Sequence, residues 1–334
     1  MRSAMTKAGA RRRAGLIAAF CAAMAPPVAS PQTAATYPNK PIRVIVPFPP
    51  GVPVDVIMRL VGARLATSLG QAVVIENKPG AGANIGTEFA ARAPNDGYTL
   101  LATASNFVAN PSLYSKVNYD PVKDFTPVTG LIRTPSVLMV PADSPIKSVQ
   151  DIIGLARAKP GALSYASGGN GSLAHFSGEL FKAGAGIDML HTPYKGAPDI
   201  LNSLLSKQTD LAFPVLVSAL PQIRAGRFRA LALTAQKRMA QLPEVPTMHE
   251  VMQAGGFDLE SENGLVAPAG VPADIIAKLN AEIVRILRDP VVADPLIASG
   301  YEVVGSTAAE FGARLVKDLA KYADIVRKSG AKVD

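Results

Sequence analysis

The sequence predicts an α/β protein built from two α/β domains with a ligand cleft between them. Short apolar runs typical of buried strands alternate with helical segments along the chain. Small, neutral loops recur where a strand gives way to a helix. The 334 residues are enough for two cores, and 48% hydrophobic with 18% charged residues is a globular composition.

The first strand–loop–helix unit lies at residues 42–69. Ile42–Phe48 has the pattern of a buried strand, a Pro/Gly-rich turn ends it, and Asp55 is expected to cap a helix that runs to Leu69. A tight loop that leads into a helix N-terminus can present backbone N–H groups to an anion. The loop residues of interest are Phe48, Gly51 and Val52.

The alternation continues to residue 106. A second strand at 73–77 leads into a Gly-rich loop that contains Asn84, and a helix follows at 87–93. A third strand at 98–104 ends at Ser105 and Asn106, which we treat as another polar loop at a strand end.

A second α/β unit follows residue 120. Residues 126–140 predict two short strands broken near Pro135, and a helix capped by Ser148 ends at residue 159. Strands are then expected at 163–167, 189–193, 210–213 and 229–233, with helices at 173–184 and 198–207. The loops after these strands contain Ser167, Gly168, Asn170, Ser172, Lys195, Gly196 and Pro214.

The C-terminal segment returns to the first unit. A strand at 264–267 precedes amphipathic helices at 273–288 and 308–328, with a helix at 291–299 and a strand at 301–304 between them. We expect these helices to pack on the first unit. The domain prediction is therefore 36–131 with 259–334 for domain 1, and 132–258 for domain 2.

Residues 1–35 have the pattern of a cleaved secretory signal peptide. Arg11–Arg13 precede an apolar stretch that is too short to span a bilayer, and Thr33-Ala34-Ala35 offers small residues for cleavage. An interfacial anchor helix is the alternative. The segment also contains the only cysteine, Cys21, so the mature protein is expected to have no disulfide and no thiolate metal site.

The signal segment also explains most of the net charge. Residues 1–30 hold five of the eight excess positive charges, which leaves +3 for the rest of the chain. With no tryptophan and 6% aromatic residues, the mature chain lacks the stacking surface typical of single-strand binding. We therefore expect no nucleic-acid partner.

Signatures of enzymes and cofactors are missing from the sequence. The three histidines, His175, His191 and His249, are too far apart for a local metal motif, and no nucleophile elbow or phosphate-binding P-loop is present. Residues 80–86 depart from the dinucleotide fingerprint by one residue. The expectation is a binding protein without metal or cofactor, in which helix N-termini hold a carboxylate.

The chain resembles the Bug family, the periplasmic solute receptors of tripartite tricarboxylate transporters. The resemblance rests on 41–51 (PIRVIVPFPPG), 74–82 (VIENKPGAG), 95–100 (NDGYTL), 119–125 (YDPVKDF), 191–196 (HTPYKG), 218–221 (SALP) and 265–270 (LVAPAG). These motifs follow one another in order along essentially the whole mature chain.

The resemblance implies a type II periplasmic-binding-protein architecture that closes on its ligand like a Venus flytrap. It implies a small organic carboxylate as ligand, a periplasmic location and delivery to two integral-membrane subunits, one large and one small. We expect the receptor itself to be a monomer. Family ligands are held partly by the first-domain loops, while the second domain contacts the distal end.

Departures from the family pattern bear on specificity. Val52 stands where a second glycine is usual, and Pro214 stands where an acidic or amide residue is common. Both make the pocket less polar, so an aromatic or aliphatic mono- or dicarboxylate is favoured over citrate or an acidic amino acid. Two alternatives stay open: a receptor for a sensor kinase without its own transporter, and a hydrolase that uses Ser167 or Ser172 with His175.

Overall fold

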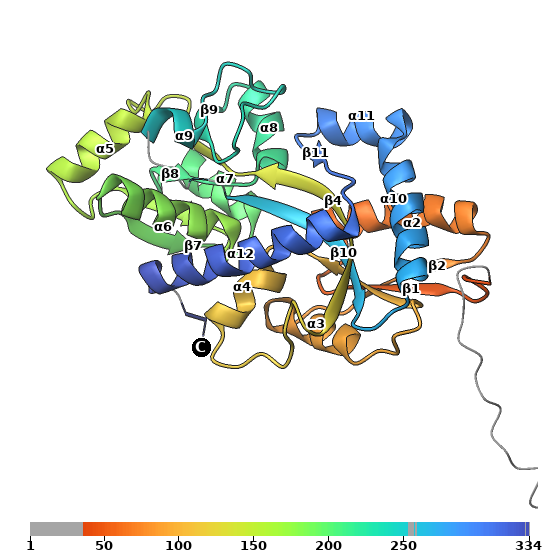
Figure 1. Ribbon diagram of the computed structural model, residues 1–334. Helices are drawn as coiled ribbons and strands as arrows, with labels where there is room; N and C mark the ends of the chain where they lie inside the picture. The colour runs from red at the N-terminus through yellow and green to blue at the C-terminus, as the bar shows by residue number, and fades with distance from the viewer. Residues whose placement is uncertain (1–35, 253–256, 258, 331, 334) are drawn as a thin grey trace, which may run out of the picture. The chain divides into compact units, whose positions relative to one another are not determined.

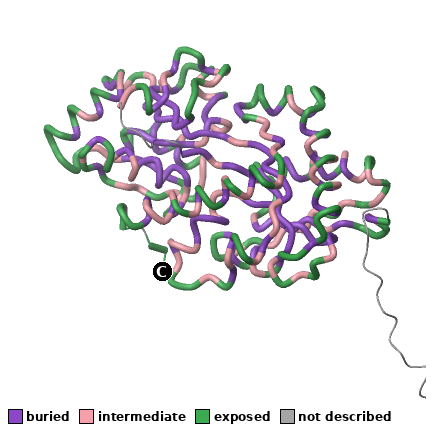
Figure 2. Tube along the Cα trace, viewed as in Figure 1, coloured by how far each residue is buried: buried purple, intermediate pink, exposed green. Residues whose placement is uncertain are grey.

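The computed structural model describes residues 36–252, 257, 259–330, 332 and 333, so the expected signal peptide lies outside the described residues. The described chain contains two sheets of mixed strand direction with helices packed on them (Figure 1). The α/β fold class predicted from the alternation of strands and helices is therefore confirmed. Buried residues concentrate along the strands of both sheets, where apolar runs were predicted (Figure 2).

The six-stranded sheet combines strands from both ends of the chain, in the order β11-β4-β10-β3-β1-β2. Strand β1 pairs in parallel with β2 and β3, whereas β10 is antiparallel to both β3 and β4. The strands are β1 (Ile42–Val46), β2 (Val73–Asn77), β3 (Thr99–Thr103), β4 (Phe125–Pro135), β10 (Glu260–Pro268) and β11 (Glu302–Val303).

Helices cover both faces of this sheet, and we call the sheet with these helices the first module. Alternate side chains of β1 enter different cores: Val44 joins the core with α2 and α10, and Ile45 joins the core with α4 and α12. The helices are α2 (Pro53–Leu69), α3 (Asn84–Ala91), α4 (Asn106–Leu113), α10 (Ala273–Arg288), α11 (Pro290–Ala298) and α12 (Ala308–Ser329), with the short 3₁₀ turn η2 (Ala81–Ala83) before α3.

The five-stranded sheet is formed by the middle of the chain, in the order β7-β6-β8-β5-β9. We call it, with its helices, the second module. Its strands are β5 (Val137–Pro141), β6 (Ser164–Ser167), β7 (Leu190–Pro193), β8 (Leu211–Ala212) and β9 (Phe228–Leu233). Its helices are α5 (Val149–Ala158), α6 (Leu173–Ala185), α7 (Ala197–Leu205), α8 (Leu216–Arg224) and α9 (Met248–Met252).

Two antiparallel strands lead from the first sheet toward the second. Strands β4 and β10 pair from Phe125↔Pro268 to Glu260↔Pro135, and β5 starts two residues after β4 ends. At this junction the Thr234 hydroxyl donates to Leu259 O at 2.6 Å and accepts the Ser136 N–H at 2.8 Å. Helix α12 contacts α4 of the first module and α6 of the second, and so bridges the two (Figure 1).

A network of ion pairs lies on these crossing strands. The Arg133 guanidinium donates to Glu262 Oε2 through Nε at 3.2 Å and Nη2 at 2.9 Å, and it lies 3.6 Å from carboxylate oxygens of Glu260 and Glu302. Arg314 of α12 approaches Glu262 at 3.9 Å. Glu262 therefore lies in the strand junction, where it links β4, β10 and α12.

Several boundaries differ from those predicted. Helix α2 begins at Pro53 with Val52 as its N-cap, so the prediction of Asp55 as the cap is wrong; the Asp55 carboxylate instead turns back to accept the Gly51 N–H. Helices α4 and α8 and the short α9 were not predicted from the sequence. Helices α4 and α8 each contain an internal proline, Pro111 or Pro221, which disfavours the prediction of a helix in a short segment.

None of the helices among the described residues is both long and apolar enough to cross a membrane.

Candidate functional site

The topology gathers the predicted loops into two groups. In the first module, β1, β2 and β3 run parallel, so the loops 47–52, 78–83 and 104–105 follow their carboxyl ends at one edge of the sheet. In the second module, β6, β7 and β8 also run parallel, so the loops 168–172, 194–196 and 213–215 share an edge. Ligands of α/β proteins commonly bind outside the carboxyl ends of parallel strands.

A buried carboxylate shapes the loop 47–52. Asp55, which is 2% exposed, accepts the Gly51 N–H at 2.9 Å and one amide hydrogen of Asn77 at 2.9 Å, and it forms a two-point ion pair with Arg59. Asn77 also donates to Phe48 O at 3.0 Å. The hydrogen bonds from Arg59 lower the pKa of Asp55 to about 2, so the carboxylate is ionised and its charge is compensated.

The N-terminus of α2 leaves peptide hydrogens available beside this loop. Val56 N bonds to Val52 O, which is the first intrahelical bond, and Pro53 has no N–H. The amides of Val54 and Asp55 are in the first turn, where an α-helix supplies no acceptor of its own. Because the Gly51 N–H is used by Asp55, the candidate anion-binding groups beside the loop are these N–H groups of α2, whose residues are 4% and 2% exposed.

Asn84 supports its loop from inside. It is buried as the first residue of α3, and its Oδ1 accepts hydrogen bonds from Asn110 at 2.7 Å and from the Tyr119 hydroxyl at 3.3 Å. Asn110 also donates to Gly82 O at 2.7 Å. The side-chain oxygen of Asn84 thus helps to hold the Gly-rich turn against α4.

The two loop groups approach each other near α4. Gly171, with φ of +78°, packs so closely that a Cβ at this position would lie 2.7 Å from Leu113 Cδ1. Leu173 and Phe176 of α6 belong to the same core as Phe107 of α4. Ser105 and Asn106 start α4 and Ser172 is the N-cap of α6, and both helices pack on α12.

A stack of rings underlies the loop 168–172. His191 of β7 lies between Tyr165 and His175, with ring centroids 4.9 Å and 4.3 Å away. His191 Nε2 is 2.6 Å from Ser167 Oγ, and His175 Nδ1 accepts the Gly171 N–H at 3.1 Å. Burial lowers the pKa of both histidines, that of His191 to about 4.

This geometry does not support the hydrolase alternative. Ser167 is fully buried, and its oxygen accepts the Gly169 N–H at 3.1 Å while lying against His191 instead of His175. Ser172 Oγ caps α6 by accepting the His175 N–H, and the His175 ring is engaged by Gly171. A nucleophile needs an exposed oxygen next to its base, and neither serine has that arrangement with His175.

The remaining predicted residues of the second module differ in exposure. Gly168, Asn170 and Lys195 are exposed, and Gly196 is half-buried as the N-cap of α7. Pro214 is buried, and its carbonyl accepts the Val137 N–H at 2.9 Å at the strand junction. Asn170 and Lys195 are therefore the exposed polar side chains of this group, while Pro214 lies at the strand junction.

The residues that support these loops were not predicted from the sequence. Asn77, Arg59, Asn110 and His191 all make the hydrogen bonds described above, yet none belongs to the loops themselves. Their only signal in the sequence is a polar side chain in or next to a strand or helix that is otherwise apolar, as in Leu190–Pro193.

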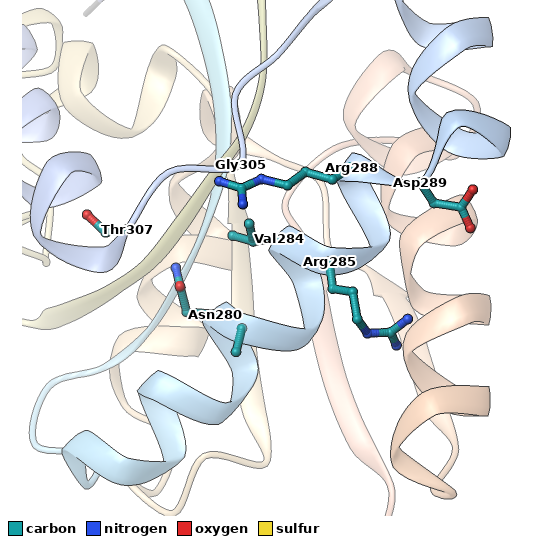
Figure 3. A pocket seen from close by; sticks show the side chains of 8 residues that line it. Asn280, Val284, Arg285, Arg288, Asp289, Gly305 and Thr307 are labelled. Atoms are coloured by element: carbon teal, nitrogen blue, oxygen red, sulfur yellow. The ribbon is translucent and has the colours of Figure 1, made fainter.

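Cavities of substantial size lie away from these loops. One of about 640 Å³ lies on the outer side of α10, and Figure 3 shows Arg288 extending over Val284 toward Gly305 while Arg285 points to the other side. Another of about 510 Å³ lies between the segment 235–241 and β11. Among the described residues, no cluster of His, Cys, Asp and Glu could hold a metal ion.

Comparison with known proteins identifies the family of the chain. Residues 57–331 match the family model described as "Tripartite tricarboxylate transporter family receptor". The chain belongs to this family. A receptor of this family binds a solute and is not an enzyme, which confirms the prediction of a non-catalytic binding protein.

Relatives of this receptor include proteins of known structure. Protein BugT of Bordetella pertussis is 35% identical over 310 residues, which cover 92% of this chain and 94% of BugT. The structure of R. palustris Rpa4515 with adipate is similar with a TM-score of 0.78 at 32% identity, covering 89% of this chain and all of that one. The structure of MatC from Rhodopseudomonas palustris with bound malate is similar with a TM-score of 0.74 at 31% identity, covering 87% of this chain and all of that one. The Bug-type resemblance and the periplasmic-binding-protein fold are thereby confirmed.

Proposed function

We propose that this receptor works in the periplasm, captures a small organic carboxylate between its two modules, and delivers it to two membrane subunits of a tripartite tricarboxylate transporter. The observation that carries the proposal is the pair of loop groups at parallel strand ends, which approach each other at α4, where Asn110 donates to Gly82 O and Leu113 lies against Gly171. We further propose a cleaved signal peptide at 1–35, domain boundaries at 36–131 with 259–334 and at 132–258, and a monomeric receptor.

The chemistry of the loops favours an anion of modest polarity. On the first module, the first-turn amides of α2 offer hydrogen bonds and the positive end of a helix dipole, and the Asp55 charge is compensated by Arg59. Val52 and Phe48 pack against the apolar core beside them. On the second module, Asn170 supplies a neutral amide and Lys195 a cation. A linear dicarboxylate, or an aromatic acid, fits this distribution better than citrate.

Related receptors support the dicarboxylate assignment. Rpa4515 was solved with adipate and MatC with malate, so two-carboxylate ligands of different length occur among similar chains. We propose that one carboxylate binds the first-module amides and that Lys195 contacts the other.

Calorimetry with adipate, malate, benzoate, citrate and glutamate tests this function. Adipate or benzoate should bind more tightly than citrate or glutamate. Lys195→Gln should weaken adipate binding by about 1–2 kcal/mol and leave benzoate nearly unchanged, since benzoate has no second carboxylate. The matched control is Lys207→Gln, because Lys207 is exposed and pairs with Asp143. Failure of every acid to bind would refute the carboxylate assignment.

Delivery to the transporter needs a separate measurement. Deleting the gene should abolish uptake of the acid that binds best, and restoring it should recover uptake. Intact uptake together with a lost transcriptional response would contradict delivery and favour the sensor alternative.

A further inference from the structure

The second-module loop 168–172 is held in shape by two imidazoles that do not line its exposed side. Ser167 Oγ lies 2.6 Å from His191 Nε2, and the same oxygen accepts the Gly169 N–H at 3.1 Å. Four residues on, the Gly171 N–H donates to His175 Nδ1 at 3.1 Å. Each end of the loop is therefore bound to a different histidine.

The two histidines are also bound to each other and to the sheet. Their rings stack at 4.3 Å with an interplanar angle of 21°, and Tyr165 stacks on the other face of His191. The Tyr165 hydroxyl donates to Glu179 of α6 at 2.6 Å. The stack thus joins β7 to β6 and α6, the two elements that the loop 168–172 connects.

The hydrogen bond from Gly171 requires the neutral form of His175, and burial disfavours the charged form of both rings. His175 Nδ1 accepts a backbone N–H, so it carries no proton. Burial, and next to it the closeness of His175, lowers the pKa of His191 to about 4, and burial lowers the pKa of His175. Two protonated rings stacked at 4.3 Å would repel each other.

The charged groups that act on the pair come from one helix. Glu179 and Lys182 of α6 oppose each other in their effect on both histidines, and they form an ion pair at 3.2 Å. Strand β6 contributes Tyr165, and α4 contributes no charge. On α12, which packs on α6, Asp318 pairs with Arg314 and Lys321.

We propose that His191 and His175 are positioning residues of the ligand site, which as neutral imidazoles hold the loop 168–172 in the conformation that receives the ligand. The inference rests on the proposed carboxylate-binding function. His191 acts through Ser167, and His175 acts through Gly171. Neither histidine contacts the ligand itself.

Substitutions that keep or remove the acceptor atoms test the proposal, with adipate as probe. His191→Gln keeps a hydrogen-bonding group near Nε2, and His175→Asn keeps an acceptor near Nδ1. Both should bind adipate within about twofold of the wild type at pH 7. His191→Phe keeps the ring stack but removes the partner of Ser167, and it should weaken binding about tenfold, the equivalent of one lost hydrogen bond.

The dependence on pH separates positioning from general structural support. At pH 4 about half of the free wild-type protein carries a proton on His191. The affinity of the wild type for adipate, divided by that of the double variant His191→Gln/His175→Asn, should therefore be about twofold lower at pH 4 than at pH 7. Because adipate is protonated to the same extent with both proteins, dividing the two affinities removes the effect of its own ionisation. His249→Gln is the matched control, because His249 is exposed on α9.

A nuclear magnetic resonance titration of the wild type tests the proposal even if the variants fail to fold. The chain has three histidines, so their ring protons can be followed in the wild type. Saturating adipate should lower the pKa of His191 further. The proposal is overturned if adipate binds but neither the affinity ratio nor the His191 titration responds. If adipate, malate and benzoate all fail to bind at pH 7, the proposed function fails, and this inference fails with it.

Discussion

Removing the positive charge from the crossing strands is the most informative test of the junction. In Arg133→Met, the buried carboxylates of Glu260 and Glu262, with side chains 5% and 6% exposed, lose the Arg133 guanidinium, which lies 3.6 Å and 2.9 Å from them. Taking one partner from a buried ion pair destabilises a protein by about 3–5 kcal/mol, because the remaining charge is left unpaired. Arg133 is 21% exposed and Arg314 stays 3.9 Å from Glu262, so we expect the lower end, about 3 kcal/mol.

Urea unfolding followed by circular dichroism measures this loss, with two further variants for comparison. Arg238→Met removes an exposed pair with Glu250, whose side chains are 46% and 43% exposed, and should cost at most about 1 kcal/mol. Adding Glu262→Gln to Arg133→Met should restore part of the loss, since the unpaired charge disappears. Equal losses in Arg133→Met and Arg238→Met, or strict additivity in the double variant, would refute the reasoning.

Three further predictions concern single positions. Asp55→Asn should lower the free energy of unfolding by about 1–3 kcal/mol at pH 7. Because the pKa of Asp55 is about 2 in the folded state and 3.8 in the unfolded state, its stabilising effect is complete above pH 3.8 and should be lost as the pH falls through 2. Urea unfolding measured at a series of pH values can follow this loss. Gly264 lies on the central strand β10, and Gly264→Ala would place Cβ 2.1 Å from the Phe311 ring of α12, so it should lower the melting temperature. The control Gly154→Ala meets open space on α5 and should leave the melting temperature unchanged. Equal melting temperatures of the two variants would contradict the close packing at Gly264. Ser148→Ala removes the capping box of α5 and should destabilise the protein by about 1 kcal/mol, so an unchanged urea midpoint would argue against that cap.

Strand and helix periodicity predicted most of the architecture. Residues 273–288 and 308–328 stand out because amphipathic helices repeat their apolar face over several turns, and the strands are short β-branched runs. Helix α4 was missed because Pro111 and its short length outweigh a weak periodicity. The approach of its last residue, Leu113, to Gly171 is a long-range contact that no local pattern encodes.

The loops of the candidate site were predictable, but their internal support was not. Gly51 and Asn84 follow strands and are conspicuous in a sequence. That Asp55 would accept the Gly51 N–H, or that Asn110 would engage Asn84, depends on where α2 and α4 lie against the sheet. A polar side chain in a helix has the same appearance in a sequence whether it supports a loop or faces water.

The order of the six-stranded sheet also affects how the chain must fold. Strand β3 ends at residue 103, but its neighbour β10 starts at residue 260, after the whole second module. A chain emerging from the ribosome therefore has β1, β2 and β3 with an open edge until nearly four-fifths of its length has been made. Contacts so distant in sequence form slowly. A delay of this kind would keep the first module unfinished during synthesis, the condition in which a chain can still be threaded through a membrane before it folds.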